Sequence, residues 1–347
     1  WYTIMIKNEM SRKNTSFKKK IEDKITNIKV QFSTPIKRRK LRNKIISFIV
    51  TVVKYVFMIG ISFVILYPLL LQLATAFRLP TDVNDPTVLW VPKQFSVQNF
   101  RIAALALKYG KSLLNTFINS LLVSIFTIIS TSFAGYTFAR IPFKGRGLLF
   151  SLAVFTIIVP QTMVSLPMYM DFAKRGLLGK KYVLFLMSAL GMGTKSGMFI
   201  YLFRQFFKGI PYELEEAAYM DGASPLGVFF KIMLPNVRSG ILTVGLLAFV
   251  WQWNDYYFTN LFYIAGSTDV TTLATQLQRI TTGSALVDAL KQANIWQLMG
   301  QEVTSNPLFV SMIVNTAGIL VMLPVLIIYF FLQKLFVQGI ERSGIVG

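Results

Sequence analysis

Apolar residues gather into six long runs along the chain, and polar stretches separate these runs. A helix that crosses a bilayer needs about 20 mostly apolar residues, and each run reaches that length. The runs are Ile45–Phe77, Ser112–Phe138, Leu148–Met170, Tyr182–Phe203, Gly240–Ile264 and Leu308–Leu332. The pattern therefore predicts an all-α integral membrane protein with six transmembrane helices.

The composition agrees with this pattern. Of the 347 residues, 54% are hydrophobic and only 15% are charged, whereas a soluble domain carries about 25% charged residues. The chain contains no cysteine and no histidine. Disulfides, histidine metal sites and catalysis by Ser-His or Cys-His pairs are therefore excluded, and we predict no metal site and no catalytic residue.

The net charge of +21 is concentrated near the N-terminus, where residues 1–46 contain fourteen Lys or Arg and three acidic residues. A basic segment directly before an apolar run is the positive-inside signal, and it also suits an anionic lipid surface. Nucleic-acid binding is the alternative, but the membrane composition of the remaining chain disfavours it. We predict a basic cytoplasmic tail at residues 1–44, a transmembrane domain at 45–340 and a cytoplasmic end at 341–347.

The first apolar run is too long for a cleavable signal and lacks a small-residue cleavage site, so we interpret it as an uncleaved span. Met5 and Met10 are both candidates for the initiator. Six spans would return the C-terminus to the cytoplasm, which makes the chain a multi-pass protein of the cell membrane. The loops then lie inside at Ala139–Gly147 and Arg204–Ser239, and outside at Arg78–Lys111, Asp171–Lys181 and Ala265–Pro307.

The orientation rests mainly on the basic tail, because the other inside segments hold nine Lys or Arg and the outside loops eleven. The last outside loop has a helix-like middle at Ser284–Met299, where Leu286 and Leu290 are among the spaced apolar residues. Loops of this length are often functional. A lid or docking surface and a passive surface loop both remain open.

The inside segment Arg204–Ser239 carries the signals of a short helix. Pro211 suits a first helical turn, and Glu213, Glu215 and Glu216 follow where the helix dipole favours acidic residues. Ala217 and Ala218 provide a small face for close packing.

Turn signals end this short helix and a second one after it. Gly222 permits the turn that ends the first helix, and a second helical piece runs over Leu226–Leu234 and stops at Pro235. A short rigid helix with a small face suits docking into a groove of a soluble partner.

The same segment resembles a known motif. Glu216-Ala217-Ala218, three residues, Gly222, nine residues and Ile232-x-Leu234-Pro235 are similar at every anchor to the EAA motif of binding-protein-dependent ABC importer permeases. Four elements at set spacings make this match specific. Further segments resemble the maltose-type carbohydrate permeases, namely Asp221-Gly222-Ala223, Leu166-Pro167-Met168-Tyr169, Gly176-Leu177-Leu178-Gly179, Trp251–Tyr256 and Gln333–Ile340.

The resemblance covers the chain from about Ile45 to its end. It does not extend to the basic tail or to Ala265–Pro307, which depart from the shorter members of the family, so no role is carried over to them. It implies the fold of a type I ABC importer permease, in which the EAA helix is a cytoplasmic coupling helix that sits in a cleft of an ATPase subunit. The residues implied in this coupling are Glu213, Glu216, Ala217, Ala218, Asp221, Gly222, Ile232, Leu234 and Pro235, with Gln338 and Gly339 of the C-terminal tail as further candidates.

The resemblance also implies partners. These are a second homologous permease, with which the chain would form a heterodimer, two ATPase subunits, an extracytoplasmic solute-binding protein and the lipid bilayer. The chain has no GxxxxGK[ST] phosphate-binding loop; the nearest sequence is Gly191-Met-Gly-Thr-Lys195-Ser196, in which Thr194 replaces the required glycine. We therefore expect no cofactor in this chain, and ATP with Mg²⁺ on the partner ATPases.

Two groups of residues are candidates for the substrate path. Lys195 is a charge within an apolar run, flanked by glycines, and such residues usually face a cavity or a partner; a structural pairing with the second permease is the alternative. Trp251, Trp253, Asn254, Asp255 and Tyr256 combine aromatic faces, which stack on sugar rings, with polar groups that bind hydroxyls. An aromatic belt at the membrane interface is the alternative for this cluster.

These observations predict a permease that imports a carbohydrate, most simply an oligosaccharide, by alternating access. Two alternatives remain: a permease of the same kind for a solute other than sugar, and an ion-coupled secondary transporter. The latter class would place paired carboxylates or histidines in its spans, and the spans hold almost no acidic residue besides Asp255. No enzymatic activity is predicted for the chain itself.

Overall fold

The computed structural model describes residues 35–79, 91–193, 195–264, 270–282, 284–292 and 306–344. The basic tail before residue 35 and parts of the two long predicted loops lie outside the described residues. The chain divides into two compact units, residues 1–70 and 71–347. The first unit is described by helix α2 (Pro35–Ala76), which ends in the second unit. The apolar stretch of α2 is long enough to cross a membrane, and its large side chains are exposed.

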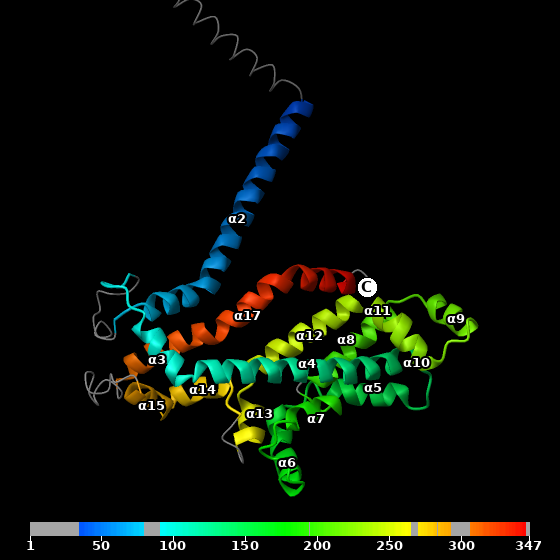
Figure 1. Cartoon of the computed structure of the whole chain (residues 1–347). Coiled ribbons are helices and arrows are strands. Elements are labelled where there is room, and N and C mark those ends of the chain that lie inside the picture. The colour runs from blue at the N-terminus through cyan, green and yellow to red at the C-terminus, as the bar shows by residue number, and fades with distance from the viewer. Residues whose placement is uncertain are drawn as a thin grey trace, which may run out of the picture. The chain divides into compact units, whose positions relative to one another are not determined.

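The described part of the second unit is helical (Figure 1). Its longer helices are α3 (Gln98–Ala106), α4 (Tyr109–Arg140), α5 (Arg146–Phe155), α6 (Gln161–Lys174), α8 (Ser196–Lys208), α12 (Arg238–Trp253), α14 (Leu273–Thr281), α15 (Ser284–Gln292) and α17 (Pro307–Gly344). The shorter elements are α7 (Val183–Ala189), α9 (Glu213–Met220), α10 (Pro225–Val228), the π-helical turn η2 (Phe229–Met233), α11 (Leu234–Asn236), α13 (Tyr257–Thr259) and the π-helical turn η3 (Asn260–Ile264).

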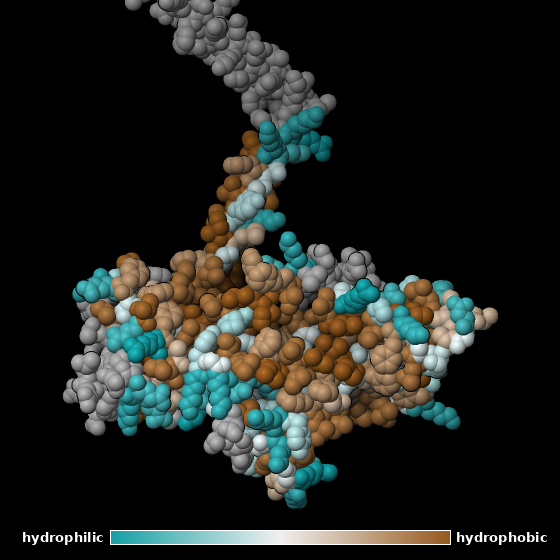
Figure 2. Space-filling view, viewed as in Figure 1, coloured by the Kyte–Doolittle hydropathy of each residue, from teal (hydrophilic) through white to brown (hydrophobic). Residues whose placement is uncertain are grey.

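Helix α4 forms the centre of this unit and packs against α7, α8 and α12. Its buried face carries small polar residues at helical spacing, among them Ser112, Thr116, Ser124 and Thr131. Small side chains let neighbouring helices approach closely, and their hydroxyls bond across the interface; Ser124 Oγ, for example, donates to the Gly245 carbonyl of α12 at 2.8 Å. Apolar side chains cover the middle of the unit (Figure 2).

Three of the six predicted spans are not single helices. Leu148–Met170 is divided between α5 and α6, and Tyr182–Phe203 between α7 and α8. Gly240–Ile264 begins within α12 and continues through α13 and η3. Among the described residues, three helices are long and apolar enough to cross a membrane, Arg42–Ala76, Tyr109–Arg140 and Pro307–Lys334.

A fourth candidate span is a pair of helices, Pro225–Asn236 and Arg238–Trp253, which meet at an angle of 79°. The sequence predicts that the first of these helices stops at Pro235, and the structure differs. The helix continues to Asn236 and bends at Val237. Pro235 lacks the N–H that an α-helix needs at this point, and the π-helical turn η2, which ends at Met233, changes the hydrogen-bond register.

Candidate functional site

Helix α9 is a short helix with defined N- and C-terminal signals. It lies at one end of the second unit, opposite the end that holds α3 and α15 (Figure 1). Its first turn contains Glu213, Glu215 and Glu216, and negative charges are favourable at this positive end of the helix dipole. At its other end, Gly222 has φ +79°. The Gly222 N–H donates to the Tyr219 carbonyl and the Ala223 N–H to the Ala218 carbonyl, both at 3.0 Å. This pair of bonds is a Schellman motif, which requires the left-handed residue at Gly222.

The two faces of α9 differ in exposure. Glu215 and Ala218 are buried, at 2% and 5% exposure, and point into the unit. Glu213, Ala217 and Met220 are spaced at i, i+4 and i+7 and form an exposed stripe, hereafter the α9 stripe. Met220 is 88% exposed. The residues predicted to make one coupling contact therefore divide: the α9 stripe is open to a partner, whereas Ala218 packs α9 onto the bundle.

The rest of the EAA motif divides in the same way. Asp221 and Gly222 are exposed, and so is Glu216. Ile232 and Leu234 are half-buried and pack against a cluster of buried residues that includes Phe207 and Met233. Gln338 and Gly339 lie within α17, which continues well past the predicted end of its span.

Glu215 occupies an unusual electrostatic position for a carboxylate. Burial raises the pKa of Glu215, while the nearby guanidinium of Arg140 and a hydrogen bond from Tyr136 oppose the rise. The Arg140 Nε to Glu215 Oε2 distance is 3.8 Å. This pair joins the end of α4 to the first turn of α9.

A second site lies where two interrupted helices meet. The chain leaves helical geometry at residues 156–160, between α5 and α6, and at residues 190–193 and 195, between α7 and α8. The two regions are in close contact, because a Cβ added at Gly197 would lie 2.3 Å from Thr156 Oγ1 and 2.4 Å from the Ala153 carbonyl oxygen. Irregular backbone at membrane depth is tolerated where it is buried in protein or lines a cavity.

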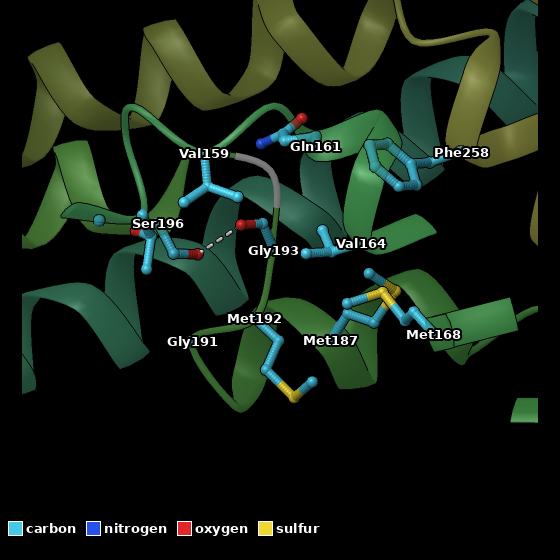
Figure 3. Close-up of a pocket in the computed structure, with 12 residues that line it drawn as sticks. Val159, Gln161, Val164, Met168, Met187, Gly191, Met192, Gly193, Ser196 and Phe258 are labelled. Carbon is cyan, nitrogen blue, oxygen red and sulfur yellow. Dashed lines mark hydrogen bonds between the residues drawn. The ribbon is translucent and has the colours of Figure 1, made fainter. Parts of the chain in front are cut away.

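A cavity of about 420 Å³ lies at this junction. Figure 3 shows Val164, Met168 and Met187 on one side of it, with Gln161 and Phe258 close by. Most of the lining is apolar, and Gln161 and Ser196 contribute polar groups. The size and the mixed lining are those of a small-molecule site.

Lys195 lies at the edge of the same junction. It precedes α8 with φ +64°, a rare backbone conformation for a residue with a side chain. It is exposed and lines an adjoining cavity of about 200 Å³ together with Gln161 and Thr162. The structure therefore places Lys195 at a break in one of the predicted spans, beside a cavity.

The aromatic cluster begins in the last turn of α12 and divides between buried and exposed residues. Trp253 is 1% exposed, and its Nε1 donates to the Val321 carbonyl of α17 at 3.1 Å, so it anchors two helices. Asp255 accepts bonds from the Thr259 N–H and hydroxyl, both at 2.8 Å, and so holds the turn before α13. Trp251 is half-buried and packs on Phe199.

Asn254 and Tyr256 are the members of this cluster that remain exposed. Sequence reasoning missed Met168, Met187 and Phe258, which line the cavity, and Arg140, which contacts α9. Met168 belongs to the predicted Leu166–Tyr169 resemblance, but nothing in that pattern shows which way its side chain points.

Comparison with protein families gives a match that covers both candidate sites. Residues 131–342, more than half of the chain, match the model of the binding-protein-dependent transport system inner membrane component. The match includes α8, the α9 stripe and the junction of the interrupted helices.

Individual relatives are similar over most of their length. The osmoprotective compounds uptake permease protein GgtD of Synechocystis is 31% identical over 75% of this chain and 79% of the relative. The maltodextrin transport system permease protein MdxG of Bacillus subtilis is 30% identical over 84% of this chain and 95% of the relative.

A solved structure shares the fold. A chain of a bacterial ABC transporter involved in the import of the acidic polysaccharide alginate superposes with a TM-score of 0.62 at 19% identity, over 82% of this chain and 96% of that chain. At this identity the likeness establishes the ABC importer permease fold. The matched family model and the two relatives together show that the chain belongs to the inner membrane components of binding-protein-dependent transport systems.

Proposed function

We propose that this chain is a permease subunit of an ATP-driven importer and that it moves a carbohydrate across the cell membrane by alternating access. Relatives are named for the transport of maltodextrin, alpha-glucosides and arabinooligosaccharides, which favours an oligosaccharide. The single observation that carries the coupling assignment is the α9 stripe, a rigid exposed edge on a helix that is capped at its C-terminal end.

The α9 stripe suits docking on a soluble ATPase subunit. Ala217 at its centre is small, so a partner groove can approach the helix backbone closely. Leu214, Tyr219 and Met220 add exposed apolar area, at 44%, 45% and 88% exposure, on an element flanked by acidic residues. Exposed apolar side chains rimmed by polar ones mark interaction sites. Gln338 and Gly339 of α17 are proposed as a second contact.

The partners follow from this assignment. Two ATPase subunits bind and hydrolyse ATP with Mg²⁺, a second permease completes the translocation path, and an extracytoplasmic binding protein delivers the solute. Both termini lie in the cytoplasm in this arrangement, so that α9 faces the ATPases.

The substrate path is proposed at the junction of the interrupted helices. Lys195 and the lining residues Gln161 and Ser196 supply polar groups, and Met168, Met187 and Phe258 supply apolar surface for sugar rings. The exposed Asn254 and Tyr256 remain candidates, whereas Trp253 and Asp255 have structural roles. A second candidate substrate is a small osmoprotective solute, because GgtD is 31% identical.

The first test is co-purification. The tagged chain, expressed with its partner permease and ATPase, is expected to retain the ATPase, and Ala217→Trp is expected to lose it because the indole fills the centre of the α9 stripe. A chain that never retains an ATPase would contradict the proposal.

The second test uses a matched pair of glycines. Gly222→Ala is expected to lower ATP-dependent uptake while leaving the protein in the membrane. An alanine in the left-handed conformation costs about 1–2 kcal/mol, and no atom lies within 4 Å of the added Cβ, so the effect is conformational. Gly209→Ala is the control, because Gly209 has φ −72°, which alanine adopts freely. Uptake assays with charged, neutral and zwitterionic solutes, in the assembled complex, identify the substrate class.

A further inference from the structure

The end of α4 is held by one arginine that contacts two other elements. The side chain of Arg140 is 8% exposed. Its Nη2 donates to the Phe207 carbonyl of α8 at 2.7 Å and also to the Ile210 carbonyl. The last carbonyls of a helix lack partners within the helix and carry its negative dipole end, so a guanidinium there is favourable.

The same guanidinium contacts the start of α9. It lies 5.4 Å from the centre of the Tyr212 ring, and Tyr212 is the residue directly before α9. Its Nε lies 3.8 Å from Glu215 Oε2. Glu215 points inward, on the opposite face of α9 from Ala217. Arg140 therefore contacts the back of the helix whose front is the α9 stripe.

The ion pair between Arg140 and Glu215 is incomplete in this structure. Arg140 Nε and Glu215 Oε1 are both buried, and neither has a hydrogen-bond partner. Arg140 Nε lies 3.8 Å from the other carboxylate oxygen, Glu215 Oε2. A charge-assisted hydrogen bond has a length of about 2.7–2.9 Å, so a shift of α9 toward α4 by roughly 1 Å would form one to Arg140 Nε. Buried polar atoms without partners are costly, and a state in which α9 is pressed inward would give Arg140 Nε a partner.

Helices α4 and α8 are tied together at this end by a second arginine. Arg204 of α8 donates from Nε to the Phe138 carbonyl of α4 at 3.2 Å, and its guanidinium stacks over Phe150 of α5 at 4.0 Å. Arg140 bonds in the reverse direction, from α4 to α8. The two helix ends therefore form one body, and a displacement of α9 against Arg140 moves both.

We propose that Arg140 is a positioning residue that transfers inward displacement of α9 to α4 and α8 by completing its ion pair with Glu215. This inference rests on the proposed docking of α9 to an ATPase. The element with two arrangements is the Arg140–Glu215 contact: open at 3.8 Å here, and closed when the ATPase presses α9 toward the bundle.

The test uses the complete transporter in lipid nanodiscs and proteoliposomes, with Glu215→Gln, Arg140→Gln and the double variant. Glutamine keeps the size of the glutamate side chain and removes its charge. We expect Glu215→Gln to co-purify with the ATPase and to hydrolyse ATP at the basal rate. We expect the amount of solute transported per ATP to fall about tenfold, within the range of allosteric couplings.

A double-mutant cycle distinguishes this role from a merely structural one. The effect of Glu215→Gln on solute transported per ATP is expected to disappear in the Arg140→Gln background. Arg204→Gln is the matched control, because Arg204 bonds α4 but has no contact with Glu215; in its background the Glu215→Gln effect is expected to persist.

The outcomes distinguish a failure of the proposed function from a failure of the positioning role of Arg140. If the unaltered chain retains no ATPase, the proposed function fails. If the ATPase is retained and Glu215→Gln transports solute at the normal ratio to ATP, or if the two substitutions act additively, the positioning role of Arg140 fails alone. A Glu215→Gln chain that no longer assembles would assign Glu215 to folding and would likewise overturn the inference.

Discussion

The crossing of α4 and α8 offers a sharp test of how this bundle is held. A Cβ added at Gly135 would lie 2.5 Å from Phe203 Cβ and 3.0 Å from the Arg204 backbone nitrogen. Both atoms belong to the backbone framework of α8, so no rotamer change moves them away. Carbon atoms in ordinary contact lie about 3.5–4.0 Å apart, and Gly135→Ala must therefore separate the two helices by roughly 1 Å.

The magnitude follows from two contributions. Overpacking a well-fitted interface costs about 1–3 kcal/mol, and the rigidity of both neighbours favours the upper part of that range. The separation also stretches the Arg204–Phe138 and Arg140–Phe207 bonds, which span the same pair of helices. A total loss of about 3 kcal/mol lowers the folding equilibrium constant roughly 100-fold.

The measurement is the free energy of unfolding of the purified chain in mixed micelles, titrated with a denaturing detergent. Gly110→Ala is the matched control, since Gly110 lies in the same helix and has no atom within 4 Å of an added Cβ. Gly110→Ala is expected to be neutral or slightly stabilising. Equal unfolding free energies for the two variants would refute the close crossing at Gly135.

Three further predictions concern single side chains. Tyr263→Phe should lower the free energy of unfolding by about 1–3 kcal/mol, because it leaves the buried Asn119 Oδ1, now 2.8 Å from the Tyr263 hydroxyl, without that donor. Trp253→Phe should also lower the free energy of unfolding, because it removes the bond from the indole to the Val321 carbonyl and leaves the space of the smaller ring unfilled; an unchanged detergent midpoint would exclude the anchor. Burial raises the pKa of Glu215, so its contribution to stability should be greatest at acidic pH and decline as the pH rises through that raised pKa, a slope that Glu215→Gln should abolish.

The short helix α9 could be predicted from sequence because its signals are local. Three acidic residues in the first turn and a glycine one residue past the C-cap specify a helix of about two turns without reference to any other element. The structure places α9 at Glu213–Met220 and Gly222 at φ +79°. The distinction between the inward Ala218 and the outward Ala217 depends on where the bundle lies, and neighbouring alanines carry no sign of it.

The interrupted spans could not be predicted in the same way. A hydropathy window averages over about 20 residues, so Leu148–Met170 reads as one span although its helix breaks at residues 156–160. Local signals were present, with Pro160 at one break and glycines beside Lys195 at the other. These signals alone do not establish a break in the helix. The break also depends on the close approach of Gly197 to Ala153 and Thr156, which is a contact between two segments far apart in the sequence.

The aromatic cluster shows how little the composition of a segment says about the roles of its residues. Tryptophans beside Asn and Asp have the composition of a sugar site, yet Trp253 and Asp255 satisfy hydrogen bonds within the fold. The amino-acid composition of a segment does not specify the direction in which its side chains point. The residues that line the cavity, Met168, Met187 and Phe258, come from three separate elements, and no window of the sequence contains them together.

Helix α8 links the two candidate sites by its length. Its 13 residues span roughly 20 Å, from the break beside Lys195 to the carbonyls that Arg140 binds. A rigid helix of this kind conveys motion from one end to the other, whereas a flexible connection would absorb it. Gly135 and Gly197 mark close contacts of α8 with α4 and α5 along its length, so a displacement that reaches α8 through Arg140 is carried along the helix to the cavity. The coupling site and the substrate path would therefore be linked by one rigid helix. A substitution that loosens the α4–α8 crossing should lower the amount of solute transported per ATP, even though it contacts neither site.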